Sequence, residues 1–437
     1  MMPVRIAHIS DTHLGSRPTN GVRHNIWSEG MKAQLLENDF YERFAEVFEK
    51  IAKVDPPVNL VVHSGDLYNS PWEKNPSQPP LQAQITAITI LQEFIKNTGI
   101  PVLIIEGNHG MFKFYEVSLL DSLRLAVPGL NVATQQDLKK AVREGTPLDF
   151  SFEKLDVFCF PYIDSAVLRS SNMIDIYDDW ITTHQKREQL RPAIAVTHGM
   201  TLDHTLYSAI FSMGYDYIAL GHDHRQVKHA SNAWYAGSPE RWSFREASDK
   251  KGFLIVDIDA GQDPEIQPYH LEFKRLALNE TISISTDDTE DSVSEKIEDW
   301  FSKKGLVAVW DPITAARVRL SIEGSSKRLS GFDLGIVFEN LRQKVLSHTS
   351  DYNVAQFVWE IKQSSDTEYT SAAYPEIESE YLIEDPEVDF KGYLATLEID
   401  KNFDIETLTK IAVTSLEFAV GKREGKMTSD ALQEGEQ

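Results

Sequence analysis

"LIIEGNHG" (residues 103–110) is an apolar run that ends abruptly in Gly107, Asn108, His109 and Gly110. Five similar runs rich in β-branched residues occupy the first half of the chain, at 4–10, 59–66, 156–162, 193–199 and 217–224. Helical patterns at 39–53 and 81–97 lie between several of them. Near-continuous apolar runs that alternate with helices predict a layered α/β fold with buried strands.

Residues that can bind a metal end or directly follow five of these six runs. In sheets of this class, ligands collect at the carboxyl ends of the strands, which explains why buried strands end in polar groups. Side chains at positions i and i+2 leave a strand on the same side and can act as a pair. The candidate ligands are Asp11, His13, Asp66, Asn108, His198, His222 and His224.

Carboxylate, imidazole and amide donors together suit Mn²⁺, and could also take Fe²⁺ or Zn²⁺. Two such ions about 3.5–4 Å apart activate a water and clamp both oxygens of a phosphoryl displacement. The ordered set therefore predicts a dinuclear metallophosphoesterase, in which Gly65, Gly107 and Gly221 keep the turns tight. His8 and His63 lie on the same kind of strand and are predicted to be packed core histidines.

Length and composition narrow the class of protein. A chain of 437 residues predicts two or three domains, and no apolar stretch of about 18 residues predicts a membrane span. The N-terminus lacks the pattern of a signal peptide. Cys159 is the only cysteine, so no intrachain disulfide can form; we expect a reducing cytosol and a thiol packed in the core.

The formal net charge of −24 argues against a surface that attracts DNA everywhere. Residues 366–437 contain 18 acidic and 6 basic side chains, so half of the net charge lies in this stretch. Local charge must therefore decide the partner.

A smaller unit is predicted after the first. Strands at 270–279, 316–324 and 355–363 and helices near 289–304 and 332–347 form a compact β-α-β-α-β pattern. The predicted boundaries are 1–265 for the first domain and 266–363 for a smaller α+β capping domain. An acidic linker (364–389), a helical segment (390–421, with an amphipathic helix at 404–420) and a disordered tail (422–437) follow.

Three stretches resemble the calcineurin-like metallophosphoesterases, and more narrowly the DNA-repair nuclease subunits called SbcD in bacteria and meiotic recombination eleven in archaea and eukaryotes. They are "HISDTHLGS" (8–16), "SGDLYNS" (64–70) and "AGSPERWSFREASDKKGFLIVDI" (236–258). The last is the most discriminating, because small-molecule phosphodiesterases have no reason to carry it. The resemblance covers about residues 4–260 well and the capping unit loosely.

The resemblance implies an α/β/β/α domain and a role for each candidate. Asp66 would bridge two divalent ions, and His109 would contact the scissile phosphate and help protonate the leaving 3′-oxygen. One ion would be held by Asp11, His13 and His224, and the other by Asn108, His198 and His222. The chain departs from the family at Gly110, where an acidic residue is usual, and at Asn69, where archaeal members often have a second histidine.

The resemblance also implies DNA as substrate and two protein partners. We expect a homodimer through the 81–97 stripe, and an SMC-like coiled-coil ABC ATPase of the SbcC type that binds the C-terminal helix. In a prokaryote, the complex would be cytoplasmic and nucleoid-associated. Basic residues near the motifs could follow a DNA backbone, although several could equally be ordinary surface charges; the candidates are Arg17, Arg241 and Arg245, within a wider cluster that includes Arg225, Lys228, Lys250 and Lys251.

The leading hypothesis is a metal-dependent nuclease, an exonuclease on double-stranded ends and an endonuclease on single strands, that acts in double-strand-break repair. A stand-alone phosphodiesterase for small esters is the second, although it leaves the capping unit and the tail helix without a purpose. A DNA-end-binding scaffold with weakened catalysis is the third, and Gly110 and Asn69 motivate it.

Overall fold

The computed structural model describes residues 3–16, 27–69, 79–112, 117–163, 173–184, 191–200, 206, 208–347 and 350–363. The predicted linker 364–389, helical segment 390–421 and tail 422–437 lie outside this part of the chain, as does Arg17. The described strands form two six-stranded sheets, one three-stranded sheet and a ribbon of β4 (Met111–Phe112) and β5 (Val117–Ser118).

The first six-stranded sheet has the order β14-β13-β1-β2-β3-β6. β1, β2, β3 and β6 run parallel, whereas β13 and β14 are antiparallel to their neighbours. All residues of β2 and β3 are buried, as expected for parallel strands covered on both faces. The strands are β1 (Val4–Ile9), β2 (Leu60–His63), β3 (Val102–Ile105), β6 (Leu130–Ala133), β13 (Gly252–Ile258) and β14 (Glu265–His270).

The second six-stranded sheet has the order β11-β12-β10-β9-β8-β7. Its four central strands are parallel, and antiparallel strands close both edges. The strands are β7 (Asp149–Ser151), β8 (Asp156–Phe160), β9 (Ala193–His198), β10 (Tyr217–Gly221), β11 (Val227–Ala230) and β12 (Ala233–Tyr235).

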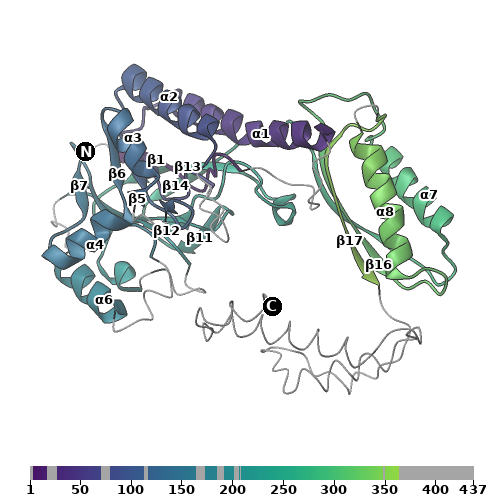
Figure 1. Ribbon diagram of the computed structural model, residues 1–437. Helices are drawn as coiled ribbons and strands as arrows, with labels where there is room; N and C mark the ends of the chain where they lie inside the picture. The colour runs from purple at the N-terminus through teal and green to yellow at the C-terminus, as the bar shows by residue number, and fades with distance from the viewer. Residues whose placement is uncertain are drawn as a thin grey trace, which may run out of the picture. The chain divides into compact units, whose positions relative to one another are not determined.

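These two sheets pack against each other through a shared core. Ile6 and Leu103 from the first sheet and Val196 and Tyr217 from the second belong to one buried cluster, and Cys159 lies in it as predicted. A separate cluster joins the outer face of the first sheet to α1, α2 and α3, and another joins the second sheet to α4, α6 and η1. The predicted α/β/β/α layering is therefore confirmed (Figure 1).

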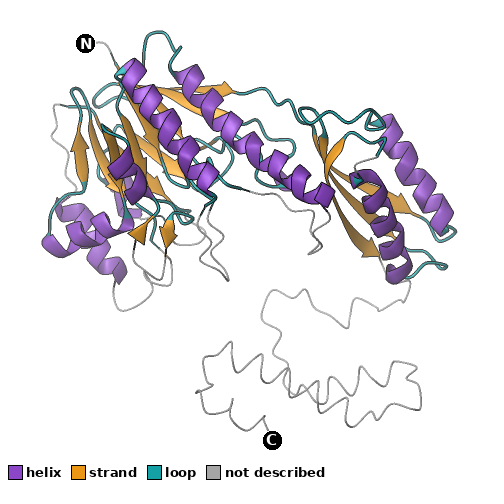
Figure 2. Cartoon of the chain, turned by 45° about the horizontal axis from the view of Figure 1, so that its top comes forward, coloured by secondary structure: helices purple, strands orange, loops and turns teal. Residues whose placement is uncertain are grey.

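The helices cover the outer faces of the sandwich, as Figure 2 shows. Their bounds are α1 (Trp27–Ile51), α2 (Leu81–Thr98), α3 (Leu120–Ala126), α4 (Gln135–Glu144), α6 (Met173–His184) and the short η1 (Ser208–Ser212) and η2 (Phe244–Glu246). α2 ends at Thr98. The next residue, Gly99, has a φ of 69°, the left-handed conformation that glycine adopts readily. Among the described helices, none is both long and apolar enough to cross a bilayer.

All six predicted strands are present, but each ends earlier than predicted. After β1, β2 and β10, the reason is the local backbone geometry. Asp11, His13, Asp66 and His222 have φ angles of 51°, 44°, 55° and 100°, which lie outside the extended region. The motif residues therefore belong to tight turns beyond the strands.

The smaller unit has its own sheet and core. β15 (Ala277–Ile284), β16 (Ala316–Gly324) and β17 (Val354–Gln363) are parallel neighbours, and α7 (Glu290–Lys303) and α8 (Gly331–Leu346) connect them. Apolar side chains of both helices and all three strands form a separate buried cluster. The predicted β-α-β-α-β pattern is confirmed, and both helices lie on one face of the sheet (Figure 1).

The prediction of a single strand over 270–279 is wrong. His270 is the last residue of β14, which pairs with β13, so the first sheet extends past the predicted boundary at residue 265. The following segment is a connection that α1 holds in place. The guanidinium of Arg275 donates to both oxygens of Asp39 on α1, at 2.6 and 3.0 Å. Side-chain anchoring to a helix therefore replaces the strand pairing that the apolar pattern suggested.

Asp288 organises the start of α7. Its carboxylate accepts hydrogen bonds from the Ser285 N–H, the Ser292 hydroxyl and the Lys296 ammonium group at 2.6, 2.7 and 2.6 Å. Burial alone would raise the pKa of Asp288, but these partners lower it well below its ordinary value. Because the folded state has the lower pKa, this contribution to stability is complete at neutral pH and is lost as the pH falls below the ordinary carboxyl range.

We expect Asp288→Asn to lower the free energy of unfolding at pH 7 by about 1–3 kcal/mol. The difference from the wild type should shrink in urea unfolding at about pH 3, below the ordinary carboxyl pKa, because the unfolded wild type then binds a proton at this group. Asp287→Asn, at the exposed neighbouring position, should leave stability unchanged at both pH values. A difference between Asp288→Asn and the wild type that does not depend on pH would contradict this account.

Candidate metal centre

The predicted ligands come from strand ends of both six-stranded sheets. Asp11, Asp66 and Asn108 follow β1, β2 and β3, which are neighbours in the first sheet. His198 ends β9 and His222 follows β10, which are neighbours in the second sheet. Because the sheets face each other across a common core, these carboxyl ends meet at one edge of the sandwich.

Asp11, His13 and His224 form one group of possible metal ligands. One donor atom from each lies within 4.8 Å of the others. The Nε2 atoms of His13 and His224 are 3.0 Å apart, and Nε2 of His224 is 3.9 Å from Oδ1 of Asp11. The structure thus brings together all three residues that the resemblance assigns to the first ion.

Asn108, His198 and His222 form the second group. The amide oxygen of Asn108 lies 2.9 Å from Nε2 of His198 and 3.0 Å from Nδ1 of His222. The two ring nitrogens are 3.3 Å apart. Three donors from two sheets therefore point at one small volume.

Asp66 lies between the two groups, where a bridging ligand was predicted. Its Oδ2 atom is 3.9 Å from Nε2 of His13 in the first group and 3.4 Å from Nε2 of His198 in the second. Its Oδ1 atom accepts a hydrogen bond from the backbone N–H of His109 at 2.9 Å. The carboxylate can therefore serve both groups while its orientation is held from the main chain.

Unusual backbone geometry is concentrated at this edge. Among the described residues, the non-glycine positions with positive φ are Asp11, His13, Asp66 and His222, all of them predicted ligands. Such conformations cost about 1–3 kcal/mol each and persist where the surrounding structure imposes them. Gly107 permits a close approach of the main chain to Asp66, because a Cβ atom there would lie 2.1 Å from Oδ1 of Asp66.

The donor set fits divalent cations. Oδ1 of Asp11 is buried, and no hydrogen-bond partner reaches it in the described part of the chain. Burial lowers the pKa of His13 well below its ordinary value, and His224 lowers it further, so His13 offers a neutral ring. Burial also acts on His198, but the Asp66 carboxylate outweighs it and raises the pKa of His198 to about 9. A cation would satisfy the facing lone pairs and balance this negative potential.

Core histidines and main-chain carbonyls support the ligands from behind. Nδ1 of His198 lies 2.8 Å from the carbonyl oxygen of Ser64, which leaves Nε2 directed at the centre. The Ser64 hydroxyl lies 2.9 Å from Nε2 of His8, whose Nδ1 is 2.7 Å from the Tyr217 hydroxyl. His8 and His63 are fully buried, as predicted for packed core residues.

Glu246 orients His224, a role that the sequence alone did not assign. Oε1 of Glu246 lies 3.2 Å from Nδ1 of His224, and Oε2 accepts a 2.7 Å hydrogen bond from Lys251. Burial alone would raise the pKa of Glu246, but His224 and Lys251 lower it well below its ordinary value. The sequence contained one hint of this role, because Glu246 is an acidic residue in the 236–258 stretch. The sequence alone does not show which ligand such a residue contacts.

The inclusion of Lys251 in a surface basic cluster is wrong. Its side chain is fully buried, and its ammonium group also donates to the carbonyl oxygen of His224 at 2.7 Å. Lys251 therefore braces the loop that carries His224. The sequence has three consecutive charged residues, Asp249, Lys250 and Lys251, directly before β13. The sequence does not show which of the two lysines points into the protein.

His109 lies at the edge of the centre. Its ring packs edge-on against His13, with centroids 5.0 Å apart, and one ring nitrogen lies within 4.8 Å of donor atoms of His13 and Asp66. Its backbone is tied to Asp66 by the hydrogen bond described above. The imidazole is therefore placed beside the first ligand group and Asp66.

The space beside Gly110 is filled by Glu106. A Cβ atom at position 110 would lie 2.9 Å from Cγ of Glu106 and 3.4 Å from its Oε1. Glu106 is buried, and its Oε2 accepts a 2.7 Å hydrogen bond from the Gln135 N–H. Burial raises the pKa of Glu106 to about 7. A side chain at position 110 would therefore meet the Glu106 side chain.

The predicted DNA-binding arginines have different surroundings. Arg245 is exposed, whereas Arg241 is half-buried, with its guanidinium carbon 3.5 Å from the ring centroid of Phe273. The carbonyl oxygen of Arg241 accepts a 2.6 Å hydrogen bond from Arg317 of the smaller unit. Asn69 is tied to the turn after β1 through its N–H, which donates to the carbonyl oxygen of Leu14 at 2.9 Å.

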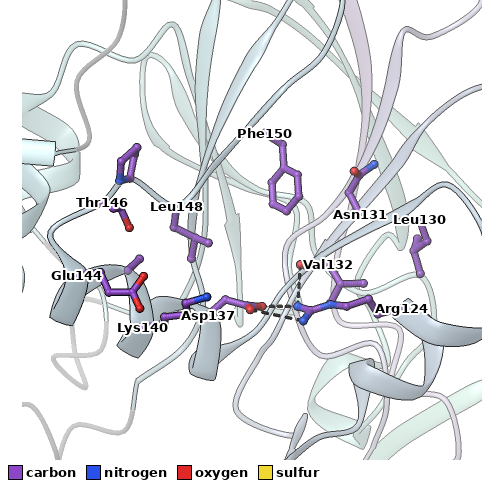
Figure 3. A pocket seen from close by; sticks show the side chains of 12 residues that line it. Arg124, Leu130, Asn131, Val132, Asp137, Lys140, Glu144, Thr146, Leu148 and Phe150 are labelled. Atoms are coloured by element: carbon purple, nitrogen blue, oxygen red, sulfur yellow. Dashed lines mark hydrogen bonds and ion pairs between the residues drawn. The ribbon is translucent and has the colours of Figure 1, made fainter.

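A separate hollow of about 430 Å³ lies between α4 and the strands β6 and β7 (Figure 3). Its lining contains none of the predicted ligands. Arg124 in its wall is occupied by Asp137, which accepts from both terminal nitrogens of the guanidinium, and by the carbonyl oxygen of Val132. The hollow is therefore distinct from the centre at the strand ends.

The family model described as calcineurin-like phosphoesterase matches residues 4–226 of the chain. This range contains Asp11, His13, Asp66, Asn108, His198, His222 and His224. The match covers just over half of the chain, and it includes both groups of possible ligands.

Curated proteins from archaea and bacteria are similar over a longer range. "DNA double-strand break repair protein Mre11" of Methanococcus maripaludis is 26% identical over 301 residues, which cover 65% of this chain and 71% of that protein. The protein of the same name from Sulfolobus acidocaldarius is 23% identical over 314 residues, 68% and 70% of the two chains. One component of the nuclease SbcCD of Staphylococcus saprophyticus is 25% identical over 325 residues, 68% and 75% of the two chains.

We expect Glu246→Gln to weaken Mn²⁺ binding by about 10- to 100-fold, because His224 loses the carboxylate that orients its ring. Isothermal titration of the metal-free protein with Mn²⁺ measures the change. Asp249→Asn is the matched control, since Asp249 lies 3.7 Å from the same lysine but forms no ion pair with His224 in the described part of the chain. Equal affinities for Glu246→Gln and Asp249→Asn would contradict the assignment.

We expect Gly110→Asp to lower the free energy of unfolding by about 1–3 kcal/mol, because its Cβ overlaps the space of Glu106. Adding Glu106→Ala should restore much of the loss, and thermal unfolding of the two single variants and the double variant measures this coupling. Gly335→Ala is the control, since a Cβ there meets Trp359 at an ordinary 3.8 Å. Additive effects of the two changes would show that Glu106 does not occupy the site of a residue-110 side chain.

Proposed function

We propose that this chain, which belongs to the calcineurin-like phosphoesterase family, is a metal-dependent nuclease of the Mre11 and SbcD type that acts in the repair of DNA double-strand breaks. The observation that carries the proposal is the convergence of two groups of donors on either side of the Asp66 carboxylate. Relatives whose names state a DNA-repair or nuclease role narrow the substrate from phosphoesters in general to DNA.

Two divalent ions would be held by the seven predicted ligands. Asp11, His13 and His224 would hold one and Asn108, His198 and His222 the other, with Asp66 shared. Ions in these positions would neutralise phosphate charge and activate a water for in-line displacement. The mixture of carboxylate, imidazole and amide donors favours Mn²⁺.

Hydrolysis forms a bond between phosphorus and a water oxygen and breaks the bond to the 3′-oxygen, which then needs a proton. We assign this proton transfer to His109, whose ring lies beside the centre and whose main chain is held by Asp66. An imidazole suits this role because it can exchange a proton near neutral pH. Glu246 and Ser64 would keep the ligand rings in the required tautomers.

The likeness to the Mre11 and SbcD proteins also suggests which DNA substrates are cleaved and which side chains contact them. We propose exonuclease activity on double-stranded ends and endonuclease activity on single strands. Arg245 is exposed and could contact the DNA backbone. Arg17 and Arg241 remain candidates, although stacking on Phe273 gives Arg241 a structural role as well.

We also propose a homodimer and an ATPase partner. On α2, Leu81 and Ile85 are exposed and available for a second copy, whereas Leu91 is buried and Ile88 and Ile95 pack on the chain's own core. The partner would be an SMC-like coiled-coil ABC ATPase of the SbcC type, bound through the 390–421 segment, in a nucleoid-associated complex of a prokaryotic cytoplasm.

We expect the purified protein to degrade DNA in the presence of Mn²⁺, and His109→Ala to cleave at least ~100-fold more slowly because the leaving oxygen is no longer protonated. Metal content, measured by mass spectrometry, should stay the same. His270→Ala, at an exposed position on β14, is the control and should cleave at the wild-type rate.

Two results would count against this assignment. Undiminished cleavage by His109→Ala would remove His109 from the reaction. A wild-type protein that hydrolyses small phosphodiesters but leaves DNA intact at every Mn²⁺ concentration would replace the nuclease with the stand-alone phosphodiesterase.

A further inference from the structure

Trp242 is a large aromatic residue exposed at the edge of the centre. Its side chain is 40% exposed. One face of the indole stacks on His13, with centroids 5.5 Å apart and an interplanar angle of 24°. His224 and His109 pack edge-on around it, at 5.6 and 6.1 Å. The ring thus contacts two possible ligands and the residue to which we assign proton transfer.

The main chain on both sides of Trp242 is held in place. The N–H of Trp242 and that of Ser243 donate to the two carboxylate oxygens of Glu246, at 3.2 and 3.1 Å. The N–H of Arg241 donates to Glu240 at 2.7 Å. The indole is therefore presented by an ordered segment, and little conformational freedom would be lost when a ligand contacts it.

Packing accounts for only part of this arrangement. One face of the indole packs on His13 and helps to bury that ring, but 40% of the Trp242 surface remains exposed. A phosphodiester bound at the centre carries a nucleoside on each side of the phosphorus, and one of these must lie towards His109 and Trp242. An exposed aromatic face beside a bound phosphate is the kind of surface on which nucleobases stack.

We propose that Trp242 is a substrate-positioning residue on which the base next to the scissile phosphate stacks. This inference rests on the proposed nuclease function and specifies its substrate further. A base inside the duplex has neighbours stacked on both faces and can reach the indole only after it unstacks, so the centre favours single-stranded or frayed ends. Stacking involves the face of the base and therefore confers little sequence preference.

A double-mutant cycle between the protein and the DNA tests this inference. Wild type and Trp242→Ala are assayed with Mn²⁺ on one oligonucleotide and on two copies of it, each with an abasic residue on one side of the scissile phosphate. We expect Trp242→Ala to lower kcat/KM on intact DNA by about 10- to 100-fold, mainly through KM. One abasic substrate should reduce the wild type to the same level and should not reduce Trp242→Ala further.

Two further variants separate stacking from structural effects. Trp242→Phe keeps an aromatic face and should retain most of the activity, whereas Phe332→Ala removes a remote aromatic side chain that is 77% exposed and should retain all of it. Mn²⁺ content should be retained in Trp242→Ala, and the loss of activity on methyl p-nitrophenyl phosphate, which has no base, should be much smaller than the loss on DNA.

Three outcomes would overturn the inference. They are additive effects of Trp242→Ala and both abasic substitutions, loss of metal from Trp242→Ala, and equal losses in Trp242→Phe and Trp242→Ala. Failure of the wild type to cleave any DNA while it still hydrolyses the small ester would instead overturn the proposed nuclease function. The two failures are therefore distinguishable.

Discussion

The carboxylate of Asp66 lies within 4 Å of imidazoles from both ligand groups, and the whole centre is built around this arrangement. His13 approaches Asp66 from the first sheet and His198 approaches it from the second, so these contacts exist only while the two sheets keep their relative position. The shared apolar core holds the sheets in that position. The backbone is strained at four ligand positions, Asp11, His13, Asp66 and His222, and the surrounding structure imposes this strain. The strained turns direct the donor atoms of these residues towards one volume.

The loop between β12 and β13 links this centre to the smaller unit. Glu246 orients His224 and binds the buried Lys251, while the carbonyl oxygen of Arg241 accepts a hydrogen bond from Arg317 on β16. α1 contributes to the same region through Arg43, whose Nε lies 3.4 Å from Glu240. The loop that orients a ligand of the centre is thus connected to the smaller sheet by hydrogen bonds and ion pairs, not by apolar contact alone. This loop is also where the sequence resemblance is most discriminating, which is consistent with its several structural tasks.

Gly110 and Glu106 are neighbours in space. The buried side chain of Glu106 fills the volume that a side chain at position 110 would enter. A glycine at this position therefore fits the packing of Glu106. Trp242 has different surroundings, because it presents an exposed aromatic surface beside a polar centre.

Local patterns in the chain predicted the six strands of the sandwich, a layered α/β fold and the set of candidate ligands, because apolar periodicity and turn residues act over a few neighbours. The α/β/β/α order of the layers came from the resemblance. Parallel strands bring Asp11 and Asn108 to one edge of the first sheet, whereas His222 joins them because the second sheet packs on the first. The same patterns did not show that 271–276 is anchored to α1, that Lys251 points inward, that Glu246 stands behind His224, or that Trp242 covers His13. Those features depend on which distant segments pack against a side chain, and burial and hydrogen-bond partners between residues far apart in the chain are settled only when the whole fold assembles.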